Sequence, residues 1–255
     1  MDATEIRRKY RLKYDLHTHT TYSCAGPYLH ATGSILENVA AGVALGLETI
    51  AITDHGPHEV YGMRIKQIPK MRQEIEEAKE LYPGIEVLLG VEADIVDTPN
   101  GTDLLDEEFE LFDFVNAGYH YGTPHSKMLR NFMSGRGIVS QSEIERLREF
   151  NTEIALRALH NNNIKVLTHP GDKAPFDMVE LCKACESTGT LMEINAKHKH
   201  MTVDEIKLAS GYDVSFIIGS DAHKPGQVGR YVSSVAKAIE AGLDLSRIVN
   251  LEERK

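Results

Sequence analysis

Cysteine is scarce in this sequence, and its distribution excludes a disulfide framework. The 255 residues contain three cysteines, Cys24, Cys182 and Cys185, an odd number and too few for the bridges that hold small secreted domains together. Cys182 and Cys185 form a C-x-x-C pattern, but no second cysteine pair completes a zinc site. Because they fall within a helical pattern of apolar residues, we interpret them as small buried residues of a helix.

Long apolar runs and a surplus of positive charge are also missing. No apolar run reaches the ~18 residues that identify a membrane-spanning helix, and the basic residues near Met1 have no apolar run behind them, so we expect a cytoplasmic protein. The net charge of −10 leaves no broad basic surface for duplex nucleic acid. With 42% apolar residues, the chain can bury one large core, and we expect a single domain over residues 1–255.

Short apolar runs alternate with longer amphipathic ones along the chain. The short runs predict seven strands, at residues 13–17, 48–53, 85–91, 113–117, 165–168, 190–194 and 214–219. The amphipathic runs predict helices at residues 34–46, 68–82, 127–134, 142–161, 176–187 and 232–241. The first helix begins at Ser34 because Glu37 follows three residues later, which is the pattern of a capping box. The alternation indicates right-handed βαβ units, and seven of them favour a closed α/β barrel over an open doubly wound sheet.

Histidine, in contrast, is plentiful, and it recurs where the predicted strands end. His17 and His19 lie one residue apart after the first strand, so both rings can face one point. Each candidate alone has an ordinary explanation, such as a helix cap or an ion pair. Together they predict a metal site at the carboxyl ends of the barrel strands. Candidates follow six of the seven strands: His17 and His19, His55, Glu92, His120, His169, and Asp221 with His223.

The residue types restrict which metals this site can bind. Imidazoles and carboxylates without thiolates suit Zn²⁺, Mn²⁺ or Fe²⁺. More than four ligands imply more than one ion. Glu92 is central in this interpretation, because a carboxylate can bridge two cations and offset their repulsion, whereas a neutral imidazole cannot.

The motifs around these residues resemble those of the PHP superfamily, named for its polymerase and histidinol phosphatase members. The resemblance covers essentially the whole chain and implies a distorted (β/α)7 barrel with a trinuclear metal centre. The matching segments are Asp15-Leu16-His17-Thr18-His19, Thr53-Asp54-His55, Gly90-Val91-Glu92, Gly118-Tyr119-His120, Thr168-His169-Pro170 and Gly219-Ser220-Asp221-Ala222-His223.

The same resemblance implies how the ligands are shared among three ions. The first would be held by His17, His19, Glu92 and Asp221, and the second by Glu92, His120 and His169. The third would be held by His30, His55 and His223, where His30 matches the family's loop ligand after a six-residue insertion.

A cluster of this kind suits phosphoester hydrolysis. Two adjacent cations can bind a hydroxide between them and direct it at phosphorus, while a third neutralises charge on the leaving oxygen. We expect a metal-dependent phosphoesterase that hydrolyses a small phosphomonoester, of the histidinol-phosphate type, with Zn²⁺ bound and Mn²⁺ or Fe²⁺ as alternatives. Glu92, Asp221 and His223 are the residues to which we assign catalytic roles.

Substrate contacts and rival functions are less clear from the sequence. Arg64 is the first candidate for a phosphate contact, since guanidinium matches phosphate bidentately, and Asn195 and His198 after the sixth strand are further candidates. Each is equally consistent with a solvated loop residue. Asp54 either supports a ligand histidine or caps a helix.

Two other classes of function stay open. Amidohydrolases that cleave C–N bonds share an H-x-H after the first strand, but a lysine commonly follows their fourth strand, where this chain has His120. A phosphodiesterase or an accessory metal-binding PHP domain is the other alternative. The oligomeric state, the physiological ester and the native metal are not specified by the sequence.

Overall fold

The fold is built on a sheet of seven parallel strands, described by a computed structural model over residues 1–25, 28–123 and 126–254. The strand order is β10-β9-β8-β7-β6-β5-β2, and every neighbouring pair is parallel. The predicted set of seven strands is confirmed, with shorter bounds at both edges. The strands are β2 (Tyr14–Asp15), β5 (Thr49–Ile52), β6 (Glu86–Asp94), β7 (Phe114–Gly118), β8 (Ile164–Leu167), β9 (Leu191–Glu193) and β10 (Phe216–Ile217).

The two edge strands, β2 and β10, approach each other, so the sheet curls into a distorted barrel. Just beyond them, Thr18 and Ala222 form a parallel bridge. The buried Asn250 side chain spans the seam: its Nδ2 donates to the carbonyl oxygens of Tyr14 and Ile218, both at 2.8 Å. The predicted barrel is therefore confirmed, although its seam is joined by a few such bonds rather than by a continuous ladder.

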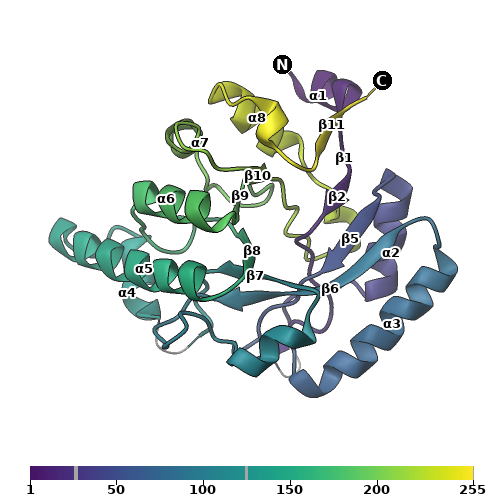
Figure 1. The fold of residues 1–255 in the computed structure, drawn as a ribbon, viewed down its shortest axis with the longest axis horizontal. Coiled ribbons are helices and arrows are strands. Elements are labelled where there is room, and N and C mark those ends of the chain that lie inside the picture. Colours follow the sequence, from purple (N-terminus) through teal and green to yellow (C-terminus); the bar gives the residue numbers. More distant parts are fainter. Residues whose placement is uncertain (26–27, 124–125, 255) are drawn as a thin grey trace.

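The helices lie around the outside of the curled sheet (Figure 1). In the described residues they are α1 (Ala3–Lys9), α2 (Ile35–Leu45), α3 (Ile68–Leu81), α4 (Met128–Ser134), α5 (Gln141–Asn161), α6 (Met178–Thr188), α7 (Val203–Ala209) and α8 (Val232–Glu240). Short 3-10 turns occur at Ile65–Gln67, Asp106–Leu111, Pro225–Gln227 and Leu245–Arg247.

Helix α2 shows why these boundaries were readable from sequence. The backbone N–H of Glu37 donates to Ser34 Oγ at 3.2 Å, and the backbone N–H of Ser34 donates to Glu37 Oε2 at 2.8 Å, which completes the predicted capping box. The helix stops at Gly46, whose φ of 74° is left-handed, a conformation that glycine adopts without steric cost.

Elements that the sequence analysis did not predict lie at the ends of the chain and in loops. Strand β1 (Tyr10–Leu12) follows α1 and pairs with β11 (Leu251–Glu253), so the two chain ends lie side by side (Figure 1). A hairpin of β3 (Cys24–Ala25) and β4 (Tyr28–Leu29) follows the first motif. These pairs are two or three residues long, too short to produce a recognisable alternation of apolar and polar residues.

The core is continuous around the barrel, and the two helical cysteines belong to it. Ile50, Ile52 and Leu89 on adjacent strands are fully buried, as expected for parallel strands that are covered on both faces. Burial raises the pKa of the Cys182 thiol to about 11, and Cys185 is equally enclosed. Both are therefore buried helix residues, as interpreted from the sequence. No helix in the described part of the chain is long and apolar enough to cross a bilayer, and the cytoplasmic location stays a prediction.

Candidate metal centre

The predicted ligands converge at the carboxyl ends of the barrel strands. Three groups that contain only buried predicted ligands, Glu92 among them, place their potential ligand atoms within 4.8 Å of one another. All members of these groups are buried. They are His17, His19 and Asp221; His17, Glu92 and His169; and His55, Glu92 and His120.

Glu92, near the carboxyl end of β6, is the shared member because its two oxygens face different histidines. Glu92 Oε2 lies 3.2 Å from His17 Nε2 and 3.4 Å from His19 Nε2. Glu92 Oε1 lies 3.0 Å from His169 Nε2 and 3.5 Å from His120 Nε2. One carboxylate therefore stands between two sets of imidazoles, which is the arrangement that a bridging ligand requires.

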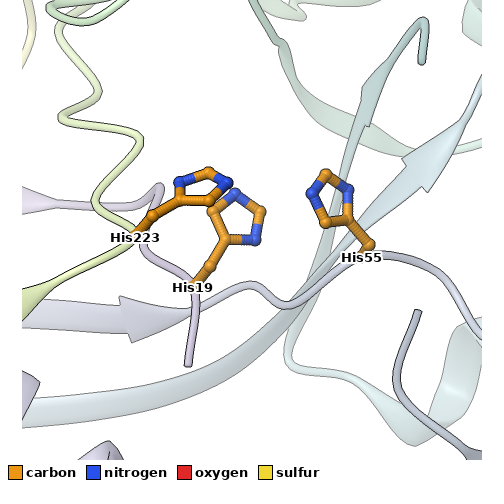
Figure 2. Close-up of side chains that lie close together, drawn as sticks. All are labelled: His19, His55 and His223. Atoms are coloured by element: carbon orange, nitrogen blue, oxygen red, sulfur yellow. The ribbon is translucent and has the colours of Figure 1, made fainter. Parts of the chain in front are cut away.

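A further group consists of His19, His55 and His223, which come from the segments after β2, β5 and β10 (Figure 2). The ring centroid of His19 lies 4.4 Å from that of His55 and 4.5 Å from that of His223. His30 is exposed, yet its ring centroid lies 5.0 Å from His55 and 4.6 Å from His223. Its ring also stacks on Tyr61 at 4.3 Å, so the structure brings His30 to this group.

Carboxylates that the sequence analysis missed stand behind the histidines. Glu193 at the end of β9 accepts a hydrogen bond from His17 Nδ1 at 2.7 Å, and Asp94 is hydrogen-bonded to His120 Nδ1. These contacts leave the Nε2 atoms of both rings facing Glu92, because a carboxylate at one ring nitrogen orients the other toward a metal.

Two features of the sequence could have identified Asp94 and Glu193 as partners of the histidines. Asp94 lies two residues after Glu92 on β6, so both side chains point to the same side of the strand. Glu193 ends the one strand to which no ligand had been assigned.

Burial and neighbouring charges both shift the pKa values of the ionisable side chains in this cluster. Burial alone would raise the pKa of Glu92, but His17 and His120 beside it hold that pKa well below its usual range. Burial would likewise lower the pKa of His17, yet Glu92 and Glu193 raise it well above the ordinary value. For His19, burial and the neighbouring His55 and His223 act together and lower the pKa. The Glu92 carboxylate is thus kept ionised by the positive charge beside it.

Unpartnered polar atoms provide a direct test of whether metal ions fit this cluster. Within the described residues, several fully buried ring nitrogens and carboxylate oxygens make no hydrogen bond, a costly arrangement unless a ligand completes it. They include His17 Nε2, both ring nitrogens of His19 and of His55, both oxygens of Glu59, and Glu92 Oε2. Nitrogen and oxygen donors that converge in this way, without thiolates, suit Zn²⁺ or Mn²⁺, so the residues present fit the implied metals.

The residues after β9 lie beside the cluster, in two different ways. Asn195 is buried, and its Oδ1 accepts hydrogen bonds from the backbone N–H groups of Lys197 and His198 at 2.8 and 2.9 Å. His198 Nε2 lies 2.9 Å from Asp221 Oδ2, and its Nδ1 lies 2.9 Å from Asp172 Oδ2. Asn195 therefore shapes the loop and also donates its Nδ2 to Asp221 Oδ2 at 3.4 Å, so both residues contact a predicted ligand. Their roles in substrate binding stay predictions.

The structure separates Arg64 and Asp54 from the cluster's interior. Arg64 is exposed at the start of a 3-10 turn, and among the described residues its guanidinium forms no hydrogen bond or ion pair. Asp54 is buried and accepts hydrogen bonds from Thr20 Oγ1 at 2.6 Å and Ser23 Oγ at 2.5 Å. It thus orders the loop after β2, and within the described part of the chain it neither caps a helix nor hydrogen-bonds to a histidine ring. A phosphate contact by Arg64 stays a prediction.

Two predicted ligands have left-handed backbone conformations. The φ angle is 29° at His169 and 48° at Asp221, values that cost non-glycine residues of order 1–3 kcal/mol each. Such conformations persist where the surroundings over-determine them, and they concentrate at functional sites. Their occurrence at two strand ends of one cluster marks it independently of the side-chain chemistry.

Comparisons with known proteins agree with this description. A probable phosphatase of Caldanaerobacter subterraneus subsp. tengcongensis is 30% identical over 245 residues, which cover 90% of this chain and 83% of the relative. Histidinol phosphate phosphatase from Lactococcus lactis subsp. lactis, solved with zinc, L-histidinol and phosphate, matches the fold with a TM-score of 0.61. The match has 19% identity and covers 91% of this chain and 94% of that one.

The fold alone does not separate phosphatases from C–N hydrolases. Dihydropyrimidinase from Brevibacillus agri matches with a TM-score of 0.51 at 10% identity, over 98% of this chain and 70% of that one. Family models are more discriminating. The model described as PHP domain matches residues 15–197, and one described as PHP-associated matches residues 205–247. Since the first spans most of the chain, including the strand ends that carry His17 to His169, the chain belongs to the PHP domain family.

Proposed function

We propose that this metal-dependent phosphatase hydrolyses a small phosphomonoester at a cluster of three divalent cations, with Zn²⁺ as the bound metal and Mn²⁺ or Fe²⁺ as alternatives. The observation that carries the proposal is the position of Glu92. Its two oxygens face separate sets of histidines, at 3.2 Å to His17 Nε2 on one side and 3.0 Å to His169 Nε2 on the other. A single ion could be bound by only one of these two sets of histidines, and the other set would have no ion to bind.

The ligand sets that we propose are those implied by the resemblance to the PHP superfamily, and the clustering of the same side chains supports them. We assign His17, His19, Glu92 and Asp221 to one ion, Glu92, His120 and His169 to a second, and His30, His55 and His223 to the third. The curated relatives named as probable phosphatases support the reaction class, and the solved relative of similar fold binds L-histidinol and phosphate.

When bound, the cations would lower the pKa of a water molecule and polarise the phosphoryl oxygens. The chain's own contribution is to hold the donor atoms in place and to exclude bulk water. Glu193 orients His17 through a 2.7 Å hydrogen bond, and Asp94 orients His120 in the same way. Asp221 stays ionised, because His17 and His19 keep its pKa well below the usual range despite its burial.

The test is phosphate release from a panel of phosphomonoesters, including histidinol phosphate, by protein loaded with Zn²⁺ or with Mn²⁺. We expect Glu92→Gln to lower turnover by more than about hundredfold, beyond the ~10–100-fold typical of a residue that acts behind a ligand. Glu86→Gln is the matched control, because Glu86 lies on the same strand but is exposed. Silence across the panel with metals bound would contradict the proposal and favour phosphodiesters or C–N substrates.

A further inference from the structure

A cavity of about 510 Å³ opens beside the metal centre, between segments that follow β7, β8 and β9. We call it the basic pocket, because basic residues outnumber acidic ones among the six titratable residues that line it. These are Arg148, Asp172, Lys173, Lys199, His200 and Glu205. The loops at the carboxyl ends of barrel strands are where substrates bind in folds of this kind, so the pocket has the location of a substrate subsite.

The pocket carries more positive than negative charge, on a chain whose net charge is −10. Its two carboxylates are already engaged: Asp172 Oδ2 lies 2.6 Å from Lys173 Nζ, and Glu205 Oε2 lies 3.0 Å from His200 Nδ1. Arg148 and Lys199 have no ion-pair partner among the described residues. Two cations without counter-charges in one concave site are the feature that recognises an anion.

The pocket is joined to the metal centre by a short chain of contacts. Asp172 Oδ2, on the pocket wall, lies 2.9 Å from His198 Nδ1, and His198 Nε2 lies 2.9 Å from Asp221 Oδ2. The pocket floor begins at Gly171, two residues after His169 in the sequence. Gly171 has a φ of 95°, and a Cβ there would lie 2.9 Å from His200 Nδ1. A side chain at this turn would therefore meet His200, which also lines the pocket.

We propose that the basic pocket binds a second anionic group of the substrate, a carboxylate or a phosphate, while the phosphoryl group to be cleaved lies at the metal centre. The inference rests on the proposed function, since it assigns the two ends of one substrate to two adjoining sites. Guanidinium and ammonium groups both bind either anion. The substrate class is therefore a phosphomonoester whose organic part is itself anionic, rather than a neutral or apolar ester.

The experiment uses phosphonates, whose C–P bond is not hydrolysed, so that binding is measured without turnover. Full-length, Zn²⁺-loaded protein is titrated calorimetrically with alkylphosphonates of increasing chain length. The ω-phosphonocarboxylates and the α,ω-bisphosphonates of the same lengths follow, and these two arms distinguish a carboxylate from a phosphate. We expect the second anion to tighten binding by about tenfold or more at one chain length, the effect of one added charge-assisted contact.

Variants of the lining residues test whether the second anion binds in the basic pocket. In the double variant Arg148→Gln with Lys199→Gln we expect this advantage to disappear. Arg146→Gln is the matched control, because Arg146 lies on the same helix α5 with an exposed side chain paired to Glu143. No advantage at any chain length, or an advantage that survives in the double variant, overturns the inference. Turnover of p-nitrophenyl phosphate by the same preparation tests the proposed function separately, so the two failures are distinguishable.

Discussion

The hydrogen bond between His17 and Glu193 leads to a quantitative prediction about metal affinity. His17 Nδ1 and Glu193 Oε1 are 2.7 Å apart, and both side chains are buried. The other carboxylate oxygen accepts from the His169 backbone N–H at 2.8 Å and from Asn195 Nδ2 at 2.9 Å. Glu193 therefore fixes one predicted ligand by its side chain and another by its backbone.

The substitution Glu193→Gln keeps the size of the side chain but removes its charge. An amide cannot accept with both of its ends, so one of the three donors loses its acceptor, and the bond to His17 is no longer charge-assisted. Loss of such a partner typically lowers metal affinity by about 10–100-fold, or about 1.4–2.7 kcal/mol. We expect Zn²⁺ affinity to fall within this range while the fold is kept.

Competition with a chelator of known affinity measures the change, and circular dichroism checks the fold. Glu180→Gln is a suitable control, because Glu180 is a half-buried residue of α6 whose carboxylate pairs with Lys183 at 2.6 Å, a surface contact of small energetic value. If Glu193→Gln bound Zn²⁺ within about twofold of the unmodified protein, the argument that this carboxylate positions His17 would be wrong.

Two further predictions concern stability. Asn250→Ala leaves the backbone groups of Tyr14 and Ile218 without their partner at the barrel seam, so we expect urea titration to show a loss of about 3 kcal/mol in the free energy of unfolding; a loss below about 1 kcal/mol would contradict this role. Burial raises the pKa of Asp103 to about 6. Since this lies above the value in the unfolded chain, the unmodified protein loses stability as pH rises from about 4 to about 6, and Asp103→Asn should gain up to about 2 kcal/mol above that window but little below it. The same advantage at pH 4 and pH 8, measured by thermal unfolding in chelator, would refute the assignment.

Much of the fold and of the cluster was predictable because both depend on local pattern. Buried parallel strands are read as apolar runs, and in a barrel the residues that follow them must meet at one end. The structure accordingly brings together His17, His55 and His169, which are far apart in sequence. Helix ends such as Ser34 and Gly46 were equally readable, since capping depends on residues within one turn.

The rest depends on contacts that sequence spacing does not encode. Asn195, a candidate substrate contact, donates its side-chain amide to Glu193 at 2.9 Å, a partner that tertiary packing sets and that its position in the sequence does not indicate. The carboxylates behind the histidines, Glu193 and Asp94, have no fixed distance in sequence from the rings they hold. The pairing of β1 with β11 joins residues 241 positions apart, and no local sequence pattern predicts such a pairing.

The seam between β2 and β10 also sets the order in which this protein can be completed during synthesis. His17 and His19 leave the ribosome some two hundred residues before Asp221 and His223, and Asn250 follows later still. Until β10 emerges, β2 is an uncovered edge of the sheet, and His19 lacks the Asp221 carboxylate that lies 3.5 Å from it. Non-local pairings of this kind form late. The proposed ion that His17, His19 and Asp221 would share can therefore meet its full set of ligands only after the β10 segment has folded beside β2.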